Sequence, residues 1–387
     1  GIVMAKGVLC GLICVVTIFP SFLLIFDKQI EKSKHKVLLP KFEKLPKFII
    51  SKQKFILIAF VLLMIPAYIG NSNYDVYYKL DESLPKDLAF NVANNDLAKK
   101  FGITSPEIII LDKNISSSEI ESLTTELKDV KGIDLVLSPS ELVNNGLETI
   151  LPDSLQEMFN NDKYQLILTN STYEIASDDL NNQLTTVNKI VHKYDKKAIV
   201  AGEGALMKDL ITIADHDFNM VNYTSLAVIF VIMLIVLKSL SLPIVLSLVI
   251  EFAIFVNMSI AYYTGTSLPF IASIVVGTIQ LGATIDYAIL MSTKYIEERQ
   301  NSSNKEKCME KTLQFTIPSI ITSALCFFAA TASVGLYTKI DMIGSICNLL
   351  ARGSLISMVA VIFILPSLLM LCDKIILKNK NAKKEGI

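Results

Sequence analysis

The stretch LPFIASIVVGTIQLGATIDYAILMSTKYIEER, residues 268–299, decides the fold of this chain. Residues 268–291 carry a single ionisable carboxylate, Asp286, which is followed at once by Tyr287. An apolar run of this length is typical of a transmembrane helix. A charged Asp near the centre of the hydrocarbon costs roughly 2.5–3.5 kcal/mol on insertion scales. We therefore interpret Asp286 as an ion or proton site with a partner on a neighbouring helix. A structural hydrogen-bond anchor between helices is the alternative.

The composition of the whole chain indicates a polytopic membrane protein. Of its 387 residues, 52% are hydrophobic, and the mean hydropathy is +0.49. These values are too apolar for an ordinary soluble protein. Seven apolar segments are candidates for membrane helices. They comprise residues 2–26, 55–69, 223–237, 242–263, 268–291, 313–337 and 343–371.

The distribution of lysine predicts the orientation of the chain. Residues 27–54 contain nine Lys and three acidic residues, and the tail after residue 371 contains five Lys and two acidic residues. The positive-inside rule predicts that both lie in the cytoplasm. Residues 71–219 contain 13 Lys and 25 acidic residues, and we expect them outside the cytoplasm. The pattern predicts a multi-pass protein of a bacterial-type cell membrane.

The first and last apolar segments match each other without a gap, and internal repeats are typical of transporters. We therefore expect the chain to be a fragment, with the last helix of one half followed by a complete second half. Its expected partner is the missing N-terminal half of the same transporter, and oligomerisation is left open. The matched runs are Ala5-Lys6-Gly7 with Ala351-Arg352-Gly353, Pro20-Ser21 with Pro366-Ser367, and Asp27-Lys28 with Asp373-Lys374.

Residues 71–219 predict an α+β domain of the ferredoxin-like type, built from two βαβ-like units. The expected strands are residues 107–112, 133–137, 164–169 and 198–201. One helix is expected to begin at residues 116–118 and the other at Ser177 or Asp178, ending near Val130 and Tyr194. Residues 202–204 are expected to form a turn, and they lack the wider pattern of a phosphate-binding loop.

The predicted domains follow from these segments. They are residues 1–26 as the last membrane helix of the preceding half, 27–54 as a basic cytoplasmic linker, 55–70 as a membrane helix, 71–219 as an extracytoplasmic porter-like domain, 220–372 as a five-helix membrane bundle, and 373–387 as a basic cytoplasmic tail.

Four polar residues of the apolar segments lie at depths that allow them to share one layer of the membrane: Asp286, Glu251, Ser319 and Ser323. At 1.5 Å per residue, Asp286 lies about 12 Å from Lys294 at the cytoplasmic end of its helix. The two serines are four residues apart and therefore share a helix face. A carboxylate with little hydration can bind and release a proton near neutral pH.

Each of these assignments has a structural alternative. The serines could serve only to pack helices together. Glu251 could be a neutral carboxyl group bonded to Asn257 or to the backbone. Gly277, Gly282 and Ala283 give the segment of Asp286 a face of small residues, which is expected to allow close packing against another helix, with a hinge as the secondary interpretation. We expect the charged end at residues 294–299 to be solvated.

Enzymatic chemistry is not indicated by the sequence. His35, His192 and His216 do not cluster, so no metal site is predicted. A nucleophile–base constellation and a cofactor-binding loop are also lacking. We therefore expect no catalytic residue and no cofactor, and we expect coupling to protons. Nucleic acid is not an expected partner.

The run GATIDYAILMSTKYIEER resembles the RND superfamily, and most closely its MMPL branch. The run PSIITSALCFFAATASVGL resembles the next helix of that family, and segments 2–26 and 343–371 resemble its closing helices. The resemblance implies two six-helix halves, each with an outer porter domain after its first helix. It also implies that Asp286 and Tyr287 are the proton-relay pair of the second half, with Ser323 beside them.

The function implied by the resemblance is export of hydrophobic or amphiphilic substrates, such as lipids or drugs, driven by the proton-motive force. Two alternatives remain open. One is a protein-export factor of the SecD and SecF type, although Tyr287 argues against it. The other is a membrane regulator of the sterol-sensing type, which need not couple to protons.

Overall fold

The computed structural model describes residues 2–33, 42–78, 85, 87–139, 141, 159 and 163–376. It divides into two compact units, Gly1–Glu43 and Lys44–Ile387. Among the described residues, seven helices are long and apolar enough to cross a membrane. The predicted polytopic helical fold is therefore confirmed. Parts of the predicted linker and tail, residues 34–41 and 377–387, lie outside the described residues.

The first unit consists mainly of one apolar helical run. It comprises α1 (Ile2–Ile13), the π-helical turn η1 (Cys14–Ile18), α2 (Phe19–Ile25) and the short polar helix α3 (Asp27–Lys32). Pro20 lies at the start of α2 and has no backbone N–H to continue the α-helical ladder. Pro perturbs the turn before it, and the wider π-helical turn ends at Ile18, two residues before Pro20.

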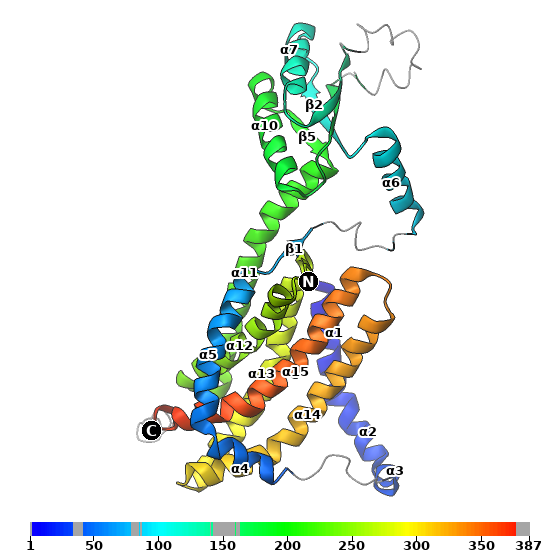
Figure 1. Ribbon diagram of the computed structural model, residues 1–387. Helices are drawn as coiled ribbons and strands as arrows, with labels where there is room; N and C mark the ends of the chain where they lie inside the picture. Colours follow the sequence, from blue (N-terminus) through cyan, green and yellow to red (C-terminus); the bar gives the residue numbers. More distant parts are fainter. Residues whose placement is uncertain are drawn as a thin grey trace. The chain divides into compact units, whose positions relative to one another are not determined.

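The membrane helices of the second unit form a bundle in which α12 and α15 are central (Figure 1). The most apolar window of each of these two helices is 56% buried, against 11–17% for α5, α11 and α14. The amphipathic helix α4 precedes α5 and packs Pro46 and Ile49 inward. The bounds are α4 (Lys44–Ser51), α5 (Gln53–Ser72), α11 (Glu203–Leu237), α12 (Ser241–Thr264), α13 (Phe270–Asn301), α14 (Lys305–Tyr337) and α15 (Asp341–Leu371).

Local signals set several helix ends. Gly265 adopts a left-handed conformation (φ 63°) and ends α12. The Asn304 side chain accepts hydrogen bonds from the backbone N–H groups of Glu306 and Lys307, and so begins α14. The short strand β6 (Leu268–Pro269), which directly precedes α13, pairs in parallel with β1 (Val76–Tyr77), which follows α5. This pair ties the segment after α5 to the start of α13.

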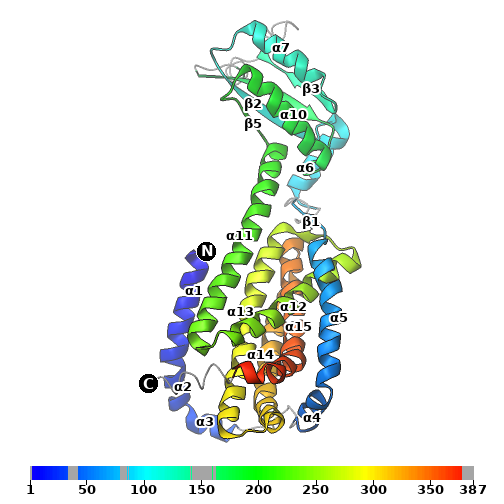
Figure 2. The same cartoon turned by 90° about the vertical axis from the view of Figure 1, so that its left-hand side faces the viewer.

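A ferredoxin-like fold is confirmed for the α/β part of the chain. Its strands are antiparallel in the order β3-β4-β2-β5, and both helices cover one face of the sheet (Figure 2). The core of this part contains Ile109 and Ile167 from the sheet and Leu123 and Val187 from the helices. The bounds are β2 (Ser105–Asp112), α7 (Ser117–Lys128), β3 (Ile133–Leu137), β4 (Tyr164–Ser171), α10 (Asp178–Tyr194) and β5 (Ile199–Gly202). A further helix, α6 (Ala89–Phe101), precedes β2 and had no sequence prediction.

The predicted helix caps are also present. Ser116 forms a capping box with Glu119 at the start of α7. The Ser177 hydroxyl accepts a hydrogen bond from the backbone N–H of Leu180 and begins α10. These short polar signals are local, which explains why the sequence located both helices to within about two residues.

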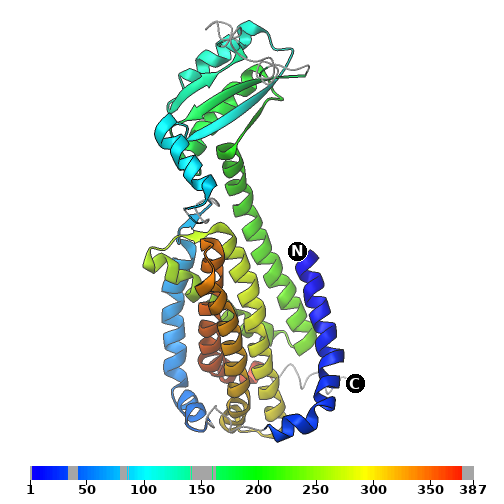
Figure 3. The ribbon, with the colours of Figure 1, turned by 90° about the vertical axis from the view of Figure 1, so that its right-hand side faces the viewer.

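The predicted turn at residues 202–204 is wrong, because α11 begins at Glu203 and continues as one uninterrupted helix to Leu237 (Figure 3). Gly202 caps it with φ 148°, a conformation that disfavours any side chain. A Cβ atom there would also collide with the Glu107 carboxylate. Glu107 is buried in β2 and accepts hydrogen bonds from the backbone N–H of Ala205 (3.4 Å) and from the Ser105 hydroxyl (3.2 Å).

The charged end of α13 is only partly solvated, contrary to expectation. The Arg299 side chain is 9% exposed, and it donates to both carboxylate oxygens of Asp373 at 2.9 and 2.8 Å. The Tyr295 hydroxyl donates to the same carboxylate at 2.7 Å. This bidentate pair joins α13 to the residues that follow α15. The sequence did not indicate this ion pair, because Arg299 and Asp373 lie 74 residues apart.

Candidate functional site

Asp286 lies on an exposed face of α13 within the unit Lys44–Ile387. Among the described residues, its carboxylate has neither a hydrogen bond nor an ion pair. Gly282, one turn earlier on the same face, has no atom within 4 Å of where its Cβ would lie. The close packing expected at Gly282 is therefore not made by the described residues, whereas a Cβ at Gly277 would lie 3.3 Å from Asn222 Oδ1 of α11. Tyr287, the next residue, lies about 100° further around the helix, where it is 6% exposed.

Ser319 and Ser323 are both exposed on α14, the helix that packs against α13. Within the described ranges, neither hydroxyl forms a hydrogen bond, and none links Asp286 to Tyr287, Glu251 or the serines. The structure thus brings the predicted residues onto neighbouring helices without joining them into a relay. Exposed polar groups on membrane helices are costly when they face lipid.

Glu251 lines a separate cavity of about 250 Å³ between α11, α12 and α13. Polar groups from α11 and α13 share this cavity with the Glu251 carboxylate of α12. They include Asn222, Tyr223, Ser273 and Thr278. The alternative bond from Glu251 to Asn257 is not formed, because Asn257 is engaged elsewhere.

A buried polar network in the bundle escaped the sequence analysis. The Arg352 guanidinium donates from Nε to Asn257 Oδ1 (2.8 Å) and from Nη2 to the Asn257 carbonyl (2.7 Å). Asn257 Nδ2 donates to Gln280 Oε1 at 2.7 Å, and Gln280 Nε2 donates to the Ser357 hydroxyl at 3.1 Å. Thr284 also donates to Ser357, at 2.7 Å. The network therefore joins α12, α13 and α15 through hydrogen bonds inside the apolar bundle.

Gly353 leaves the space that this network occupies. A Cβ at Gly353 would lie 2.5 Å from Gln280 Oε1 and 2.6 Å from Asn257 Nδ2. One sequence signal for the network was present, since Gln280 and Thr284 are four residues apart in the stretch that carries Asp286. They lie on the face of α13 turned toward α15, where Thr284 is fully buried. The network and Asp286 thus use different faces of one helix.

Cofactor and metal binding receive no geometric support from the described ranges. Within them, no group of three or more His, Cys, Asp or Glu side chains is placed to hold a metal ion. The arrangement offers a carboxylate on an exposed helix face, a second carboxylate in a polar cavity, and a fixed hydrogen-bonded centre. Such groups can exchange protons and fix the positions of helices.

Comparison with known proteins gives matches over most of the chain. A model of the MMPL family matches residues 152–386. The chain is 22% identical over 220 residues to the "Probable transport protein MmpL1" of Mycobacterium tuberculosis. This match covers 55% of the present chain and 23% of MmpL1. The chain is also 21% identical over 371 residues to the "Putative membrane protein MJ1562" of Methanocaldococcus jannaschii. This match covers 84% of the present chain and 92% of MJ1562.

Among solved structures, the crystal structure of SecDF in its super-membrane-facing form is similar, with a TM-score of 0.46 and 13% sequence identity. That match covers 91% of this chain and 41% of the SecDF chain. The chain therefore spans less than half the length of MmpL1 and of the SecDF chain, and most of the length of MJ1562.

Proposed function

The chain belongs to the MMPL family of membrane proteins, and on this premise we propose that it drives the export of hydrophobic or amphiphilic molecules with protons. Lipids and lipophilic drugs are the proposed substrates. The proposed location is the cell membrane, with residues 71–219 outside the cytoplasm. The acidic character of residues 71–219 and the basic character of residues 27–54 support this orientation.

Asp286 is the observation that carries the proposal. Its carboxylate lies in an apolar membrane helix, on an exposed face and without a partner among the described residues. An intramembrane carboxylate of this kind is costly unless it has a function. Protonation removes the charge, so the helix face can alternate between a charged and a neutral state. Tyr287, Ser319 and Ser323 are the proposed neighbours in the relay.

A second membrane bundle is required to cover the Asp286 face. Ser319 and Ser323 are exposed on the adjacent helix, and Gly282 leaves room for a close approach. We assign this role to the pseudo-symmetric half whose last helix is represented by residues 2–26. A second copy of the same chain is the other arrangement that would cover this face.

Inverted vesicles containing the native assembly provide the test. Addition of a lipophilic dye such as Nile red to acidified vesicles should release protons, which a pH-sensitive fluorophore in the lumen detects. We expect Asp286→Asn to abolish the dye-dependent proton flux, because Asn keeps the size of Asp but cannot carry a proton. Glu297→Gln, an exposed position on the same helix, is the matched control and should retain the flux.

Normal flux in a well-expressed Asp286→Asn protein would contradict the proposal. Proton flux without dye movement would argue against export of amphiphiles. Accumulation of unexported precursor proteins in cells carrying Asp286→Asn, with unchanged dye efflux, would instead favour a protein-export factor.

A further inference from the structure

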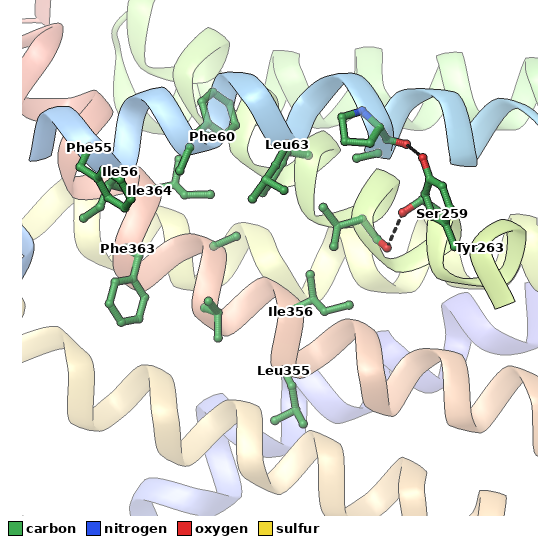
Figure 4. Close-up of a pocket in the computed structure, with 17 residues that line it drawn as sticks. Phe55, Ile56, Phe60, Leu63, Ser259, Tyr263, Leu355, Ile356, Phe363 and Ile364 are labelled. Atoms are coloured by element: carbon green, nitrogen blue, oxygen red, sulfur yellow. Dashed lines mark hydrogen bonds between the residues drawn. The ribbon is translucent and has the colours of Figure 1, made fainter. Parts of the chain in front are cut away.

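An apolar groove lies between α5 and α15, with α12 as its floor (Figure 4). Its volume is about 600 Å³, within the ~300–1,000 Å³ of typical ligand sites. Figure 4 shows Phe55 and Leu63 of α5 facing Ile356 and Phe363 of α15 across the groove. Among its lining residues, only Ser259 and Tyr263 carry polar side chains.

Large apolar side chains are left uncovered along the groove. Phe55 is 71% exposed and Leu63 is 55% exposed, whereas Phe60 is buried by an edge-to-face contact with Phe252 at 4.9 Å. The floor is thus well packed and the walls are open. An apolar ligand would cover these walls without disturbing the contact between α5 and α12.

One end of the groove offers no free polar group. The Tyr263 hydroxyl donates to the Pro66 carbonyl at 3.0 Å, and the Ser259 hydroxyl donates to the Val256 carbonyl at 2.9 Å. Gly70 closes this end, because a Cβ there would lie 2.5 Å from the Ser259 Cβ. A ligand with a polar headgroup therefore has to place that headgroup at the opposite end.

The opposite end carries positive charge. Gln53 Nε2 donates to the Ser367 carbonyl at 3.1 Å, which fixes the first turn of α5 against α15. Lys52 and Lys54 flank Gln53, are exposed, and have no ion pair within the described part of the chain. The amphipathic helix α4 adds the exposed Lys44 beside them, whereas the charge of Lys47 is offset by an ion pair with Glu310 at 3.8 Å. Lysines at the end of a membrane helix attract anionic lipid headgroups.

We propose that this groove binds one acyl chain of an anionic phospholipid, whose headgroup lies at Lys52 and Lys54. From Phe55 to Pro66 the groove follows α5 for about 16 Å at 1.5 Å per residue. This length is roughly half of the ~30 Å hydrocarbon core, which is the depth of one leaflet. The lipid therefore belongs to the leaflet on the α4 side. The proposal does not depend on the proposed transport activity, because a resident lipid and a transported lipid would bind alike.

Fluorescence quenching tests the proposal directly, because the chain contains no Trp. Phe363→Trp places a reporter in the groove. Leu248→Trp places a control on the exposed surface of α12, about two turns from the same end of the bundle. The full chain is reconstituted in nanodiscs that contain small fractions of brominated phosphatidylglycerol or brominated phosphatidylcholine. Quenching at each reporter gives the relative affinity for the two lipids.

We expect the groove reporter to prefer phosphatidylglycerol, and the control reporter to show little preference. About 1 kcal/mol per lysine corresponds to roughly fivefold, so two lysines give up to roughly thirty-fold selectivity. Lys52→Gln/Lys54→Gln should remove most of this selectivity, whereas Lys196→Gln/Lys197→Gln, two exposed lysines far along the chain, should leave it unchanged. Ala59→Phe, which fills the groove, should reduce quenching by both lipids.

Three results would overturn the proposal. The first is equal selectivity at the groove and control reporters. The second is selectivity that survives Lys52→Gln/Lys54→Gln. The third is a groove reporter that neither lipid quenches, which would mean that another protein segment occupies the groove. Loss of dye-driven proton flux in Asp286→Asn does not affect this test, so the two proposals can fail separately.

Discussion

Arg352 and Asn257 form a two-point contact in the membrane bundle, with the guanidinium bound to both the side-chain oxygen and the backbone carbonyl of Asn257 at 2.8 and 2.7 Å. The pair fixes α15 against α12. Charged groups inside a bundle are tolerated when they bind one another or backbone carbonyls. The repeat matches Arg352 with Lys6, so the equivalent position of the first segment also carries a cation.

Gly353→Ala should destabilise the protein by roughly 1–3 kcal/mol, the usual cost of overpacking. The added methyl group would collide with Gln280 and Asn257 and separate the groups of the network. The measurement is thermal unfolding in detergent. Gly282→Ala is the matched control, because its Cβ meets nothing within 4 Å and alanine favours a helix. Equal melting temperatures for the two variants would show that the network does not depend on Gly353.

Glu107 should make the α/β part of the chain less stable as the pH rises. Burial raises the pKa of Glu107 to about 7 from its ordinary value of 4.5, although hydrogen bonds from Ala205 and Ser105 oppose the rise. The nearby Glu203 carboxylate adds to it. Between these two values the unfolded chain loses the proton before the folded chain does. Stability therefore falls from pH 4.5 to pH 7, by roughly 3 kcal/mol at most, and is level outside that window.

Glu107→Gln removes the titrating group and should remove this dependence. Hydrogen exchange of β2 and of the first turns of α11 measures it, with each variant compared with the wild type at pH 5 and pH 8. We expect the Gln variant to be better protected from exchange than the wild type. This difference in protection should be larger at pH 8 than at pH 5. Glu121→Gln, an exposed position on α7, should show no such difference. An equal effect of Glu107→Gln at both pH values would contradict the assignment.

Glu251→Gln should reduce dye-driven proton flux several-fold, less severely than Asp286→Asn. Glu251 lines a cavity with polar side chains of α11 and α13, and the neutral Gln amide is compatible with these polar surroundings. The vesicle assay described above measures the flux, with expression level and melting temperature as controls for folding. A complete loss would mean that Glu251 rather than Asp286 carries the coupled proton.

The proposed orientation predicts opposite labelling of two introduced cysteines. The native Cys308 is unsuitable as the site of labelling from the cytoplasm, because it is 1% exposed and its Sγ donates to the Glu298 carbonyl at 3.3 Å. In a background without the native cysteines, Ser303→Cys and Asn182→Cys are both exposed. An impermeant maleimide should label Asn182→Cys in intact cells and Ser303→Cys only in inverted vesicles. Labelling of both from the outside would reverse the predicted topology.

The sequence by itself determined the elements whose signals are local. Apolar runs of membrane length predicted the seven helices that, among the described residues, are long and apolar enough to cross a membrane, because the hydrocarbon core requires each helix to satisfy its own backbone. Ser116 and Ser177 located two helix starts through caps formed within three residues. Short apolar runs and their βαβ order along the chain predicted the ferredoxin-like sheet. The isolated carboxylate of Asp286 was visible as soon as its apolar neighbours were counted.

Tertiary structure decided which polar residues meet. Arg299 and Asp373 are 74 residues apart, and Arg352 and Asn257 are 95 residues apart, so no local pattern pairs them. Helix α11 could not be anticipated from Glu203 onward, because its start depends on Gly202 fitting against the buried Glu107. Helical periodicity gives the angle between two residues around one helix, but it does not tell which side of the helix packs against a neighbouring helix. Only the packed bundle shows that Thr284 faces inward while Asp286, two residues later, faces outward.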